Sequence, residues 1–216
     1  MMKGISGAVL VGGKSRRMGR DKALLAVGGQ PLLQRVVEAL GEVTDELLLV
    51  GVEAERYAWL GGRAVDDLVP GGGPLAGIYT ALSVARHSYC LVVACDMPFL
   101  NTDLLSYMRQ QAMGWDAVVP RLQGWWLEPL HAVYARACLK PVERMLENGN
   151  QCILDLFPLV RTRYLETHEV ALFDPGGRSF VNLNTLTDLA LVQTLGRASL
   201  TVDMNEEKES ALVGSG

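Results

Sequence analysis

The chain has 216 residues, of which 49% are hydrophobic and 20% are charged, the composition of an ordinary globular protein. Its formal net charge of −4 excludes a protein whose whole surface attracts nucleic acid, since such surfaces are strongly basic. No stretch reaches the roughly 18 apolar residues of a membrane span, and the four cysteines include no C-x-x-C pair. We therefore expect a cytoplasmic protein with reduced core thiols that binds neither nucleic acid nor a membrane.

Strand and helix patterns alternate along the chain. Residues 5–11 (ISGAVLV) form an apolar run that predicts a strand covered on both faces, and Pro31 opens an amphipathic helix over residues 31–42. Asn101 is the expected cap of a later helix. Further strands are expected at 46–52, 64–68, 89–95, 116–120, 131–135 (antiparallel or at an edge) and 180–183, and further helices at 74–86, 101–108, 137–148 and 185–195.

This alternation predicts an α/β fold, a three-layer α/β/α sandwich with a mostly parallel, Rossmann-like mixed sheet. Ligands of such sheets bind outside the carboxyl ends of the strands. No linker divides residues 5–197, so a single domain over residues 1–198 is expected. Residues 199–216 are polar and acidic without a core pattern, which predicts a disordered tail or a non-native remnant.

A glycine-rich basic segment, residues 10–22 (LVGGKSRRMGRDK), follows the first strand. Gly12 and Gly13 would let backbone N–H groups approach a polyphosphate closely. Five basic residues follow within ten positions, and cations so close together repel one another unless an anion binds between them. The alternative is a plain Gly-Gly turn with a solvated basic loop. We interpret the segment as a phosphate-binding loop for a nucleoside triphosphate.

Two familiar glycine motifs do not account for these residues. A Walker A loop needs glycine five residues before the Gly13–Lys14 pair, where Ala8 stands. Residues 71–76 formally match a dinucleotide fingerprint, but the segment before them is short and acidic. Pro74 also removes a backbone donor where the pyrophosphate would bind. We interpret the second match as chance.

Carboxylates stand at two positions where strands end. Asp96 follows the strand at 89–95 and should emerge at the same sheet edge as the Gly12–Gly13 loop, where a single aspartate with substrate phosphates suits Mg²⁺. Its alternative role is a turn or helix cap. Asp66 and Asp67 precede the Pro-Gly-Gly-Gly-Pro loop, where one of them could accept the N1–H and 2-amino donors of guanine. Alternatively, the carboxylates of Asp66 and Asp67 are only solvated by water.

Polar side chains for a second substrate are expected near other strand ends. These are His131, Asn182 and Asn184. For His131, a buried structural role is an equally good interpretation. His87 and His168 lack ligand spacing, so a zinc site has little support. Trp125 and Trp126 fit a core or an interface better than a stacking platform.

Six segments in order give a family resemblance over residues 5–197: LVGGKSRRMGRDK, PLLQRV, DDLVPGGGPLAGI, CDMPFL, EPLHAVY and FVNLNT. With them the chain resembles the molybdenum cofactor guanylyltransferases. The resemblance implies a nucleotide-diphospho-sugar transferase-like fold. It also implies transfer of GMP from Mg·GTP to the terminal phosphate of molybdenum-molybdopterin, forming molybdopterin guanine dinucleotide and pyrophosphate. The substrates are then GTP and molybdopterin, the cofactor is Mg²⁺, and molybdoenzymes or their chaperones are candidate protein partners.

The resemblance also assigns roles to residues of this chain. Asp67 aligns with the aspartate on the guanine side, Asp96 with the magnesium ligand, and Asn182 and Asn184 with residues on the molybdopterin side. The phosphate-binding and charge-neutralising residues are Leu10, Val11, Gly12, Gly13, Arg17 and Lys22. The family loop usually reads LAGG, from which Val11 departs in one small apolar residue. Where some members carry a nucleotide-binding Asn after the second strand, this chain has Val50, Gly51 and Val52, so only backbone contacts remain there.

The expected reaction is in-line attack of the acceptor phosphate on the α-phosphorus of GTP, with Asp96, Lys22 and Arg17 as the catalytic residues. A phosphate monoester is ionised near neutral pH, so no general base is needed. Two alternatives stay open: a molybdopterin cytidylyltransferase or another nucleotidyltransferase of this fold, and a non-catalytic GTP-binding module that delivers the cofactor. Gly-Gly at 12–13, where cytidylyl relatives tend to carry Ala-Gly, favours guanine.

Overall fold

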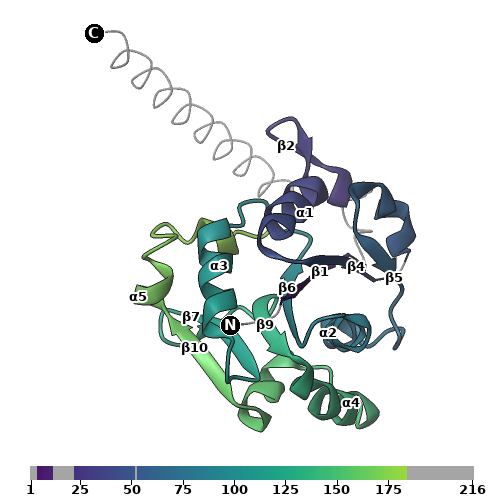
Figure 1. Cartoon of the computed structure of the whole chain (residues 1–216), viewed down its shortest axis with the longest axis vertical. Helices are drawn as coiled ribbons and strands as arrows, with labels where there is room; N and C mark the ends of the chain where they lie inside the picture. The colour runs from purple at the N-terminus through teal and green to yellow at the C-terminus, as the bar shows by residue number, and fades with distance from the viewer. Residues whose placement is uncertain (1–3, 12–21, 52, 184–216) are drawn as a thin grey trace.

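The computed structural model describes residues 4–11, 22–51 and 53–183, with only the backbone of Lys22 (Figure 1). In this part of the chain one sheet has the order β10-β7-β9-β6-β1-β4-β5, with β8 paired to β7. Its strands are β1 (Ser6–Leu10), β4 (Glu46–Val50), β5 (Arg63–Val65), β6 (Tyr89–Ala94), β7 (Ala117–Leu122), β8 (Trp126–Leu127), β9 (His131–Ala135) and β10 (Thr162–Glu166). A separate hairpin pairs β2 (Ala26–Val27) with β3 (Gln30–Pro31).

Most strands of the sheet run in one direction. β1 is parallel to β4 and β6, β5 to β4, and β10 to β7, whereas β9 is antiparallel to both β6 and β7. The strands β1, β4, β5, β6, β7 and β10 therefore all end at one edge, which we call the carboxyl edge, and β9 begins there. The opposite, amino edge carries the first residues of these strands, such as Ser6 and Glu46.

Helices cover both faces of the sheet, with α1 and α3 on one side and α2 and α4 on the other (Figure 1). The helices are α1 (Leu32–Val43), α2 (Gly73–Val84), α3 (Thr102–Gln111), α4 (Leu139–Glu147) and α5 (Thr167–Val170). Short 3₁₀ segments cover Lys22–Leu24, Ala54–Leu60, Arg136–Cys138, Ile153–Leu159 and Arg178–Phe180. No helix of the described residues is long and apolar enough to cross a membrane.

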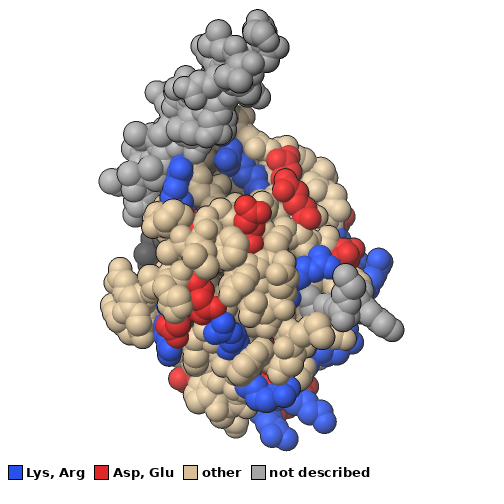
Figure 2. All heavy atoms as spheres, turned by 60° about the vertical axis from the view of Figure 1, so that its left-hand side comes forward, with Lys and Arg blue, Asp and Glu red and all other residues tan. Residues whose placement is uncertain are grey.

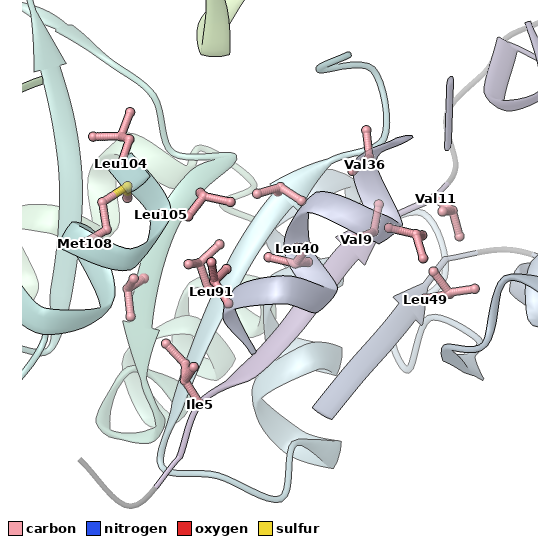
Figure 3. Packing of buried hydrophobic residues seen from close by; sticks show 14 of the residues in the cluster. Ile5, Val9, Val11, Val36, Leu40, Leu49, Leu91, Leu104, Leu105 and Met108 are labelled. Carbon is pink, nitrogen blue, oxygen red and sulfur yellow. The ribbon is translucent and has the colours of Figure 1, made fainter. Parts of the chain in front are cut away.

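Two large apolar clusters, one on each face of the sheet, make most of the core. Successive strand residues point to opposite faces, so Val9 packs with α1 and α3 while Ala8 packs with α2. Figure 3 shows the first cluster, in which Val36 and Leu40 of α1 lie over the sheet. All four cysteines are free; Cys90 and Cys138 are buried as expected, but Cys152 is exposed and is no core thiol.

The structure confirms the three-layer fold with a mostly parallel sheet and most of the expected elements. The cap is also confirmed, because the Asn101 side chain accepts the N–H of Leu104 at 2.8 Å. The strand at 131–135 is antiparallel, but it lies between β6 and β7 and not at an edge. The helix at 185–195 and the tail 199–216 lie outside the described residues.

The strand expected at 180–183 is wrong. A 3₁₀ turn covers Arg178–Phe180 instead, because Asp174 accepts the backbone N–H groups of Arg178 and Ser179 at 3.0 and 2.7 Å. The segment then runs beside the end of β6, where Leu183 N donates to Asp96 O at 2.9 Å. It cannot add to the sheet there, since β6 already pairs with β1 and β9.

Charged side chains of both signs share the face shown in Figure 2, where basic and acidic residues are interspersed over a mostly uncharged surface. The described part of this face therefore carries no continuous surface of a single charge sign.

Candidate active site

The end of β1 is joined to its neighbours by backbone hydrogen bonds. Val11 N donates to Val50 O at 2.8 Å, and Cys95 N donates to Leu10 O at 3.3 Å. On the other side of β6, Ala94 N donates to Leu130 O at 3.0 Å. Asp96 follows at once, so it lies between the segment that leaves β1 and the residues that lead into β9.

Helix α2 passes close to the end of β1. A Cβ atom added to Gly77 would lie 3.0 Å from Leu10 Cδ1, so the bare glycine is what allows this approach. The helix begins at Gly73 with Pro74 in its first turn, and its N-terminus lies at the carboxyl edge. The partial positive charge of a helix N-terminus favours an anion nearby. The N-terminus of α2, which favours an anion, thus lies close to Leu10 and Val11, where the glycine-rich segment begins.

The loop before α2 has a backbone that only glycine adopts readily. Gly71 and Gly73 have φ angles of 81° and 65°, and a Cβ atom at Gly72 would lie 2.7 Å from that of Ala76. Gln151, from the segment after α4, holds the loop by donating its Nε2 to Gly71 O at 3.1 Å. The loop therefore offers bare, fixed backbone groups to a ligand.

Asp67 lies at the end of β5 and is partly buried. The next residue is anchored, because Leu68 N donates to the buried hydroxyl of Thr80 at 3.0 Å. Burial raises the pKa of the Asp67 carboxyl, and the neighbouring Asp66 raises it further. Among the described residues no salt bridge offsets this burial. Asp67 is therefore a carboxylate that would gain from hydrogen-bond donors of a ligand.

A second carboxylate, Glu128, accompanies Asp96. It is 8% exposed, and its Oε1 accepts the indole N–H of Trp126 at 2.5 Å. Burial raises the pKa of Glu128; the bond from Trp126 lowers it, and the negative charge of nearby Asp96 raises it. Glu128 thus lies at the middle of the carboxyl edge, within electrostatic range of Asp96.

His131 opens β9 and is completely buried. Its ring lies 4.9 Å from the ring of Phe180, and neither ring nitrogen has a hydrogen-bond partner among the described residues. Burial lowers the pKa of His131 to about 4, against an opposing effect of Asp174. The imidazole is therefore neutral at physiological pH, and its role toward a second substrate stays a prediction.

Asn182 lies beside the same centre. Its segment is tied to Asp96 by the bond from Leu183, and its own Nδ2 donates to Phe180 O at 3.4 Å. Leu10, Val11, Asp96 and Asn182 are thus gathered around the end of β6, with Asp67 on the far side of β4. Outside the described residues lie Gly12, Gly13, Arg17, Asn184 and the side chain of Lys22.

Glu128 and Trp126 are candidate site residues that the sequence alone did not reveal. A single glutamate in the segment WWLEPLHAVY has no spacing that signals a site. The available hint was a charged residue placed between apolar ones just before a strand. Its proximity to Asp96 arises only from the pairing of β9 with β6.

Comparison with known proteins gives consistent results. The family model described as "MobA-like NTP transferase domain" matches residues 7–167. A probable molybdenum cofactor guanylyltransferase from Pelotomaculum thermopropionicum is 42% identical over 196 residues, covering 91% of this chain and 95% of that protein.

Solved structures agree as well. Molybdopterin-guanine dinucleotide biosynthesis protein A from Archaeoglobus fulgidus superposes with a TM-score of 0.76 at 30% identity, over 88% of this chain and 97% of that chain. A 2-C-methyl-D-erythritol 4-phosphate cytidylyltransferase from Thermus thermophilus shares the fold, with a TM-score of 0.65 at 18% identity over 88% of this chain and 98% of that chain.

Proposed function

The chain belongs to the MobA-like NTP transferase domain family, and on this premise we propose that it transfers GMP from GTP to the terminal phosphate of molybdenum-molybdopterin. The products are molybdopterin guanine dinucleotide and pyrophosphate. The observation that carries the proposal is the position of Asp96, at the end of β6 between the exit of β1 and Glu128. The cytoplasm, where GTP is made, is the compartment that this activity predicts.

The reaction requires positioning more than acid–base chemistry. An oxygen of the acceptor phosphate attacks the α-phosphorus of GTP, a new P–O bond forms, and the bond to the β-phosphate oxygen breaks as pyrophosphate leaves. The attacking phosphate is already ionised near neutral pH, so no side chain must remove a proton. His131 is completely buried and its pKa is lowered, so it is a weak base, which agrees with a mechanism that uses no histidine base.

The donor set at Asp96 fits a magnesium ion. Mg²⁺ needs only one or two protein carboxylates when substrate phosphates and water complete its shell. The described residues contain Asp96 with Glu128 beside it, and no group of three or more metal-ligating side chains. When bound, Mg²⁺ supplies positive charge that offsets the charge of the phosphates. In this proposal Asp96 would hold the ion, and Lys22 and Arg17 would neutralise further phosphate charge.

The two substrates have separate sides. Asp67 and the bare loop at residues 71–73 are on the β4–β5 side and would receive the guanine and its nucleoside. Asn182, Asn184 and His131 are assigned to the acceptor. Leu10, Val11, Gly12 and Gly13 are assigned to the triphosphate between them. Molybdoenzymes or their chaperones would receive the product.

Labelled nucleotides test the proposal. The protein is incubated with molybdopterin and with GTP, CTP or ATP, each radiolabelled at the α-phosphate. We expect label to enter the acceptor from GTP alone, with Mg²⁺ required. Label from CTP instead would assign the chain to the cytidylyltransferases, and binding of GTP without transfer would assign it to cofactor delivery.

A further inference from the structure

An exposed pair of tryptophans stands at the carboxyl edge. β8 is antiparallel to β7, and the hairpin between them closes at Gln123 and Gly124, whose φ angles are 51° and 78°. Positive φ at two successive residues is typical of tight hairpin turns. Trp125 and Trp126 follow, 69% and 52% exposed, with ring centroids 5.5 Å apart in an edge-to-face arrangement. Of the two positions expected for them, the core is therefore wrong, and the interface stays a prediction.

Trp126 is held in place by its strand pairing and by one hydrogen bond. Leu122 is its partner across the hairpin and packs against the cluster beneath α1 and α3. Directly opposed residues share a face, so Trp126 lies on that face too. Its indole N–H is bound to Glu128. Two residues after Glu128, Leu130 O accepts the N–H of Ala94, which stands two residues before Asp96. An exposed indole, bound to one buried carboxylate, thus lies at the same sheet edge as the proposed reaction centre.

The sheet order separates this hairpin from the nucleotide side. Asp96 follows β6, Asp67 follows β5, and the hairpin extends β7. The hairpin and Asp67 therefore lie on opposite sides of Asp96. Adjacent strands are about 4.8 Å apart, which puts β7 on the order of 10 Å from β6. A GTP that extends from Asp96 toward Asp67 leaves the β9–β7 side to the acceptor.

We propose that Trp126, with Trp125 packed against it in the edge-to-face arrangement, forms the surface on which the pterin ring of the acceptor stacks. The inference rests on the proposed function, because it takes the acceptor to be a pterin that carries a phosphate. Flat conjugated rings stack on indole faces, and an exposed indole held in one orientation loses little freedom on binding. The neighbouring residues Arg121 and Glu166 are charged and form a salt bridge, so the apolar surface here consists of the two indoles. Such a surface is smaller than a typical protein–protein interface.

The test separates the two substrates kinetically. Trp126→Ala is expected to raise KM for molybdopterin about tenfold, the loss of one aromatic stack, and to leave KM for GTP unchanged. Trp126→Phe keeps a flat ring and should restore most of the affinity. Trp115→Ala is the matched control, because Trp115 is also exposed (39%) but precedes β7 at the amino edge. It should behave as the wild type.

Tryptophan fluorescence gives a second readout that needs no turnover. The chain has four tryptophans, and adding molybdopterin without GTP should quench the wild type and Trp115→Ala but quench Trp125→Ala/Trp126→Ala much less. An unchanged acceptor KM in the double variant would overturn the proposal. So would a defect limited to transfer onto a molybdoenzyme, which would make the pair a protein-docking site. A wild-type protein that forms no dinucleotide from GTP would instead refute the proposed function.

Discussion

Three acidic residues at the amino edge of the sheet differ from two at its carboxyl edge. At the amino edge the carboxylates of Asp45, Glu46 and Asp116 are held by hydrogen bonds and ion pairs, and their pKa values are lowered. At the carboxyl edge burial raises the pKa values of Asp67 and Glu128. Charge that is fully compensated stabilises the fold, whereas charge left short of partners is available to a ligand.

Glu46 shows the first case. Its side chain is 5% exposed; it accepts the hydroxyl of Ser6 at 2.6 Å and the backbone N–H of Arg86 at 2.8 Å, and it pairs with Arg63. Burial alone would raise the pKa of Glu46, but these bonds outweigh it and lower the pKa. Asp116 is similar, because Arg161 binds it through the side chain and the backbone. These residues join the starts of neighbouring strands.

Asp96→Asn tests the carboxyl edge with the largest expected effect. The substitution keeps the shape of the side chain but removes the charge that is proposed to hold Mg²⁺. We expect turnover to fall about 10²–10³-fold, the range for loss of one electrostatic contact in a transition state, with Tm unchanged. Steady-state rates of dinucleotide formation and a thermal melt measure the two quantities. Wild-type turnover would remove Asp96 from the site.

Glu46→Gln tests the amino edge, where the effect should fall on stability alone. Loss of the charged acceptor should lower the free energy of unfolding by about 2 kcal/mol and Tm by about 6 °C, with kcat unchanged.

The pH dependence of the Glu46 effect has a definite sign. Because folding lowers the Glu46 pKa from its usual 4.5, this stability is present above pH 4.5 and is lost as pH falls through the folded pKa. Melts of both proteins across the acid range should therefore converge. A constant difference would show that packing, not charge, is responsible.

Asp67→Asn sharpens the comparison, since it should move binding and stability in opposite directions. KM for GTP should rise about tenfold, as for a lost hydrogen bond to a charged acceptor. Folding raises the pKa of Asp67, so the folded state holds the proton more firmly and the ionised form costs stability at neutral pH. Tm of the variant should therefore stay equal or rise.

The Asp67 carboxylate also predicts a pH profile. The acid limb of kcat/KM for GTP should lie above the usual aspartate pKa of 3.8 in the wild type, because protonation removes the acceptor. The limb should disappear in Asp67→Asn. A variant with lower Tm and unchanged KM would place Asp67 with the structural acids of the amino edge.

Local pattern was enough for much of the fold. The apolar spacing in residues 31–42 predicted α1, because a helix buried on one face has apolar residues at helical spacing. The apolar run at 5–11 predicted β1, because a strand buried on both faces is apolar throughout. β10 (TRYLE) was not predicted, since this edge strand is mostly polar. The alternation in residues 180–183 predicted a strand that β6 cannot accept, because both its sides are occupied.

The candidate site also contains residues that the sequence predicted and residues that it did not. Asp67 and Asp96 follow strands of a parallel sheet, so their common edge followed from the sequence. Glu128 and Trp126 reach that edge only because the chain reverses in the β7–β8 hairpin and returns beside β6 as β9. Such long-range pairing has no local signature, and a single glutamate or an indole pair does not reveal it.

Pyrophosphate release tests the central claim most directly. Wild-type protein is mixed with Mg·GTP, with and without molybdopterin, and pyrophosphate and guanine dinucleotide are both quantified. Our account predicts one pyrophosphate for each dinucleotide formed, no release without the acceptor, and loss of both products in Asp96→Asn. GTP binding without pyrophosphate release in the presence of molybdopterin would contradict it.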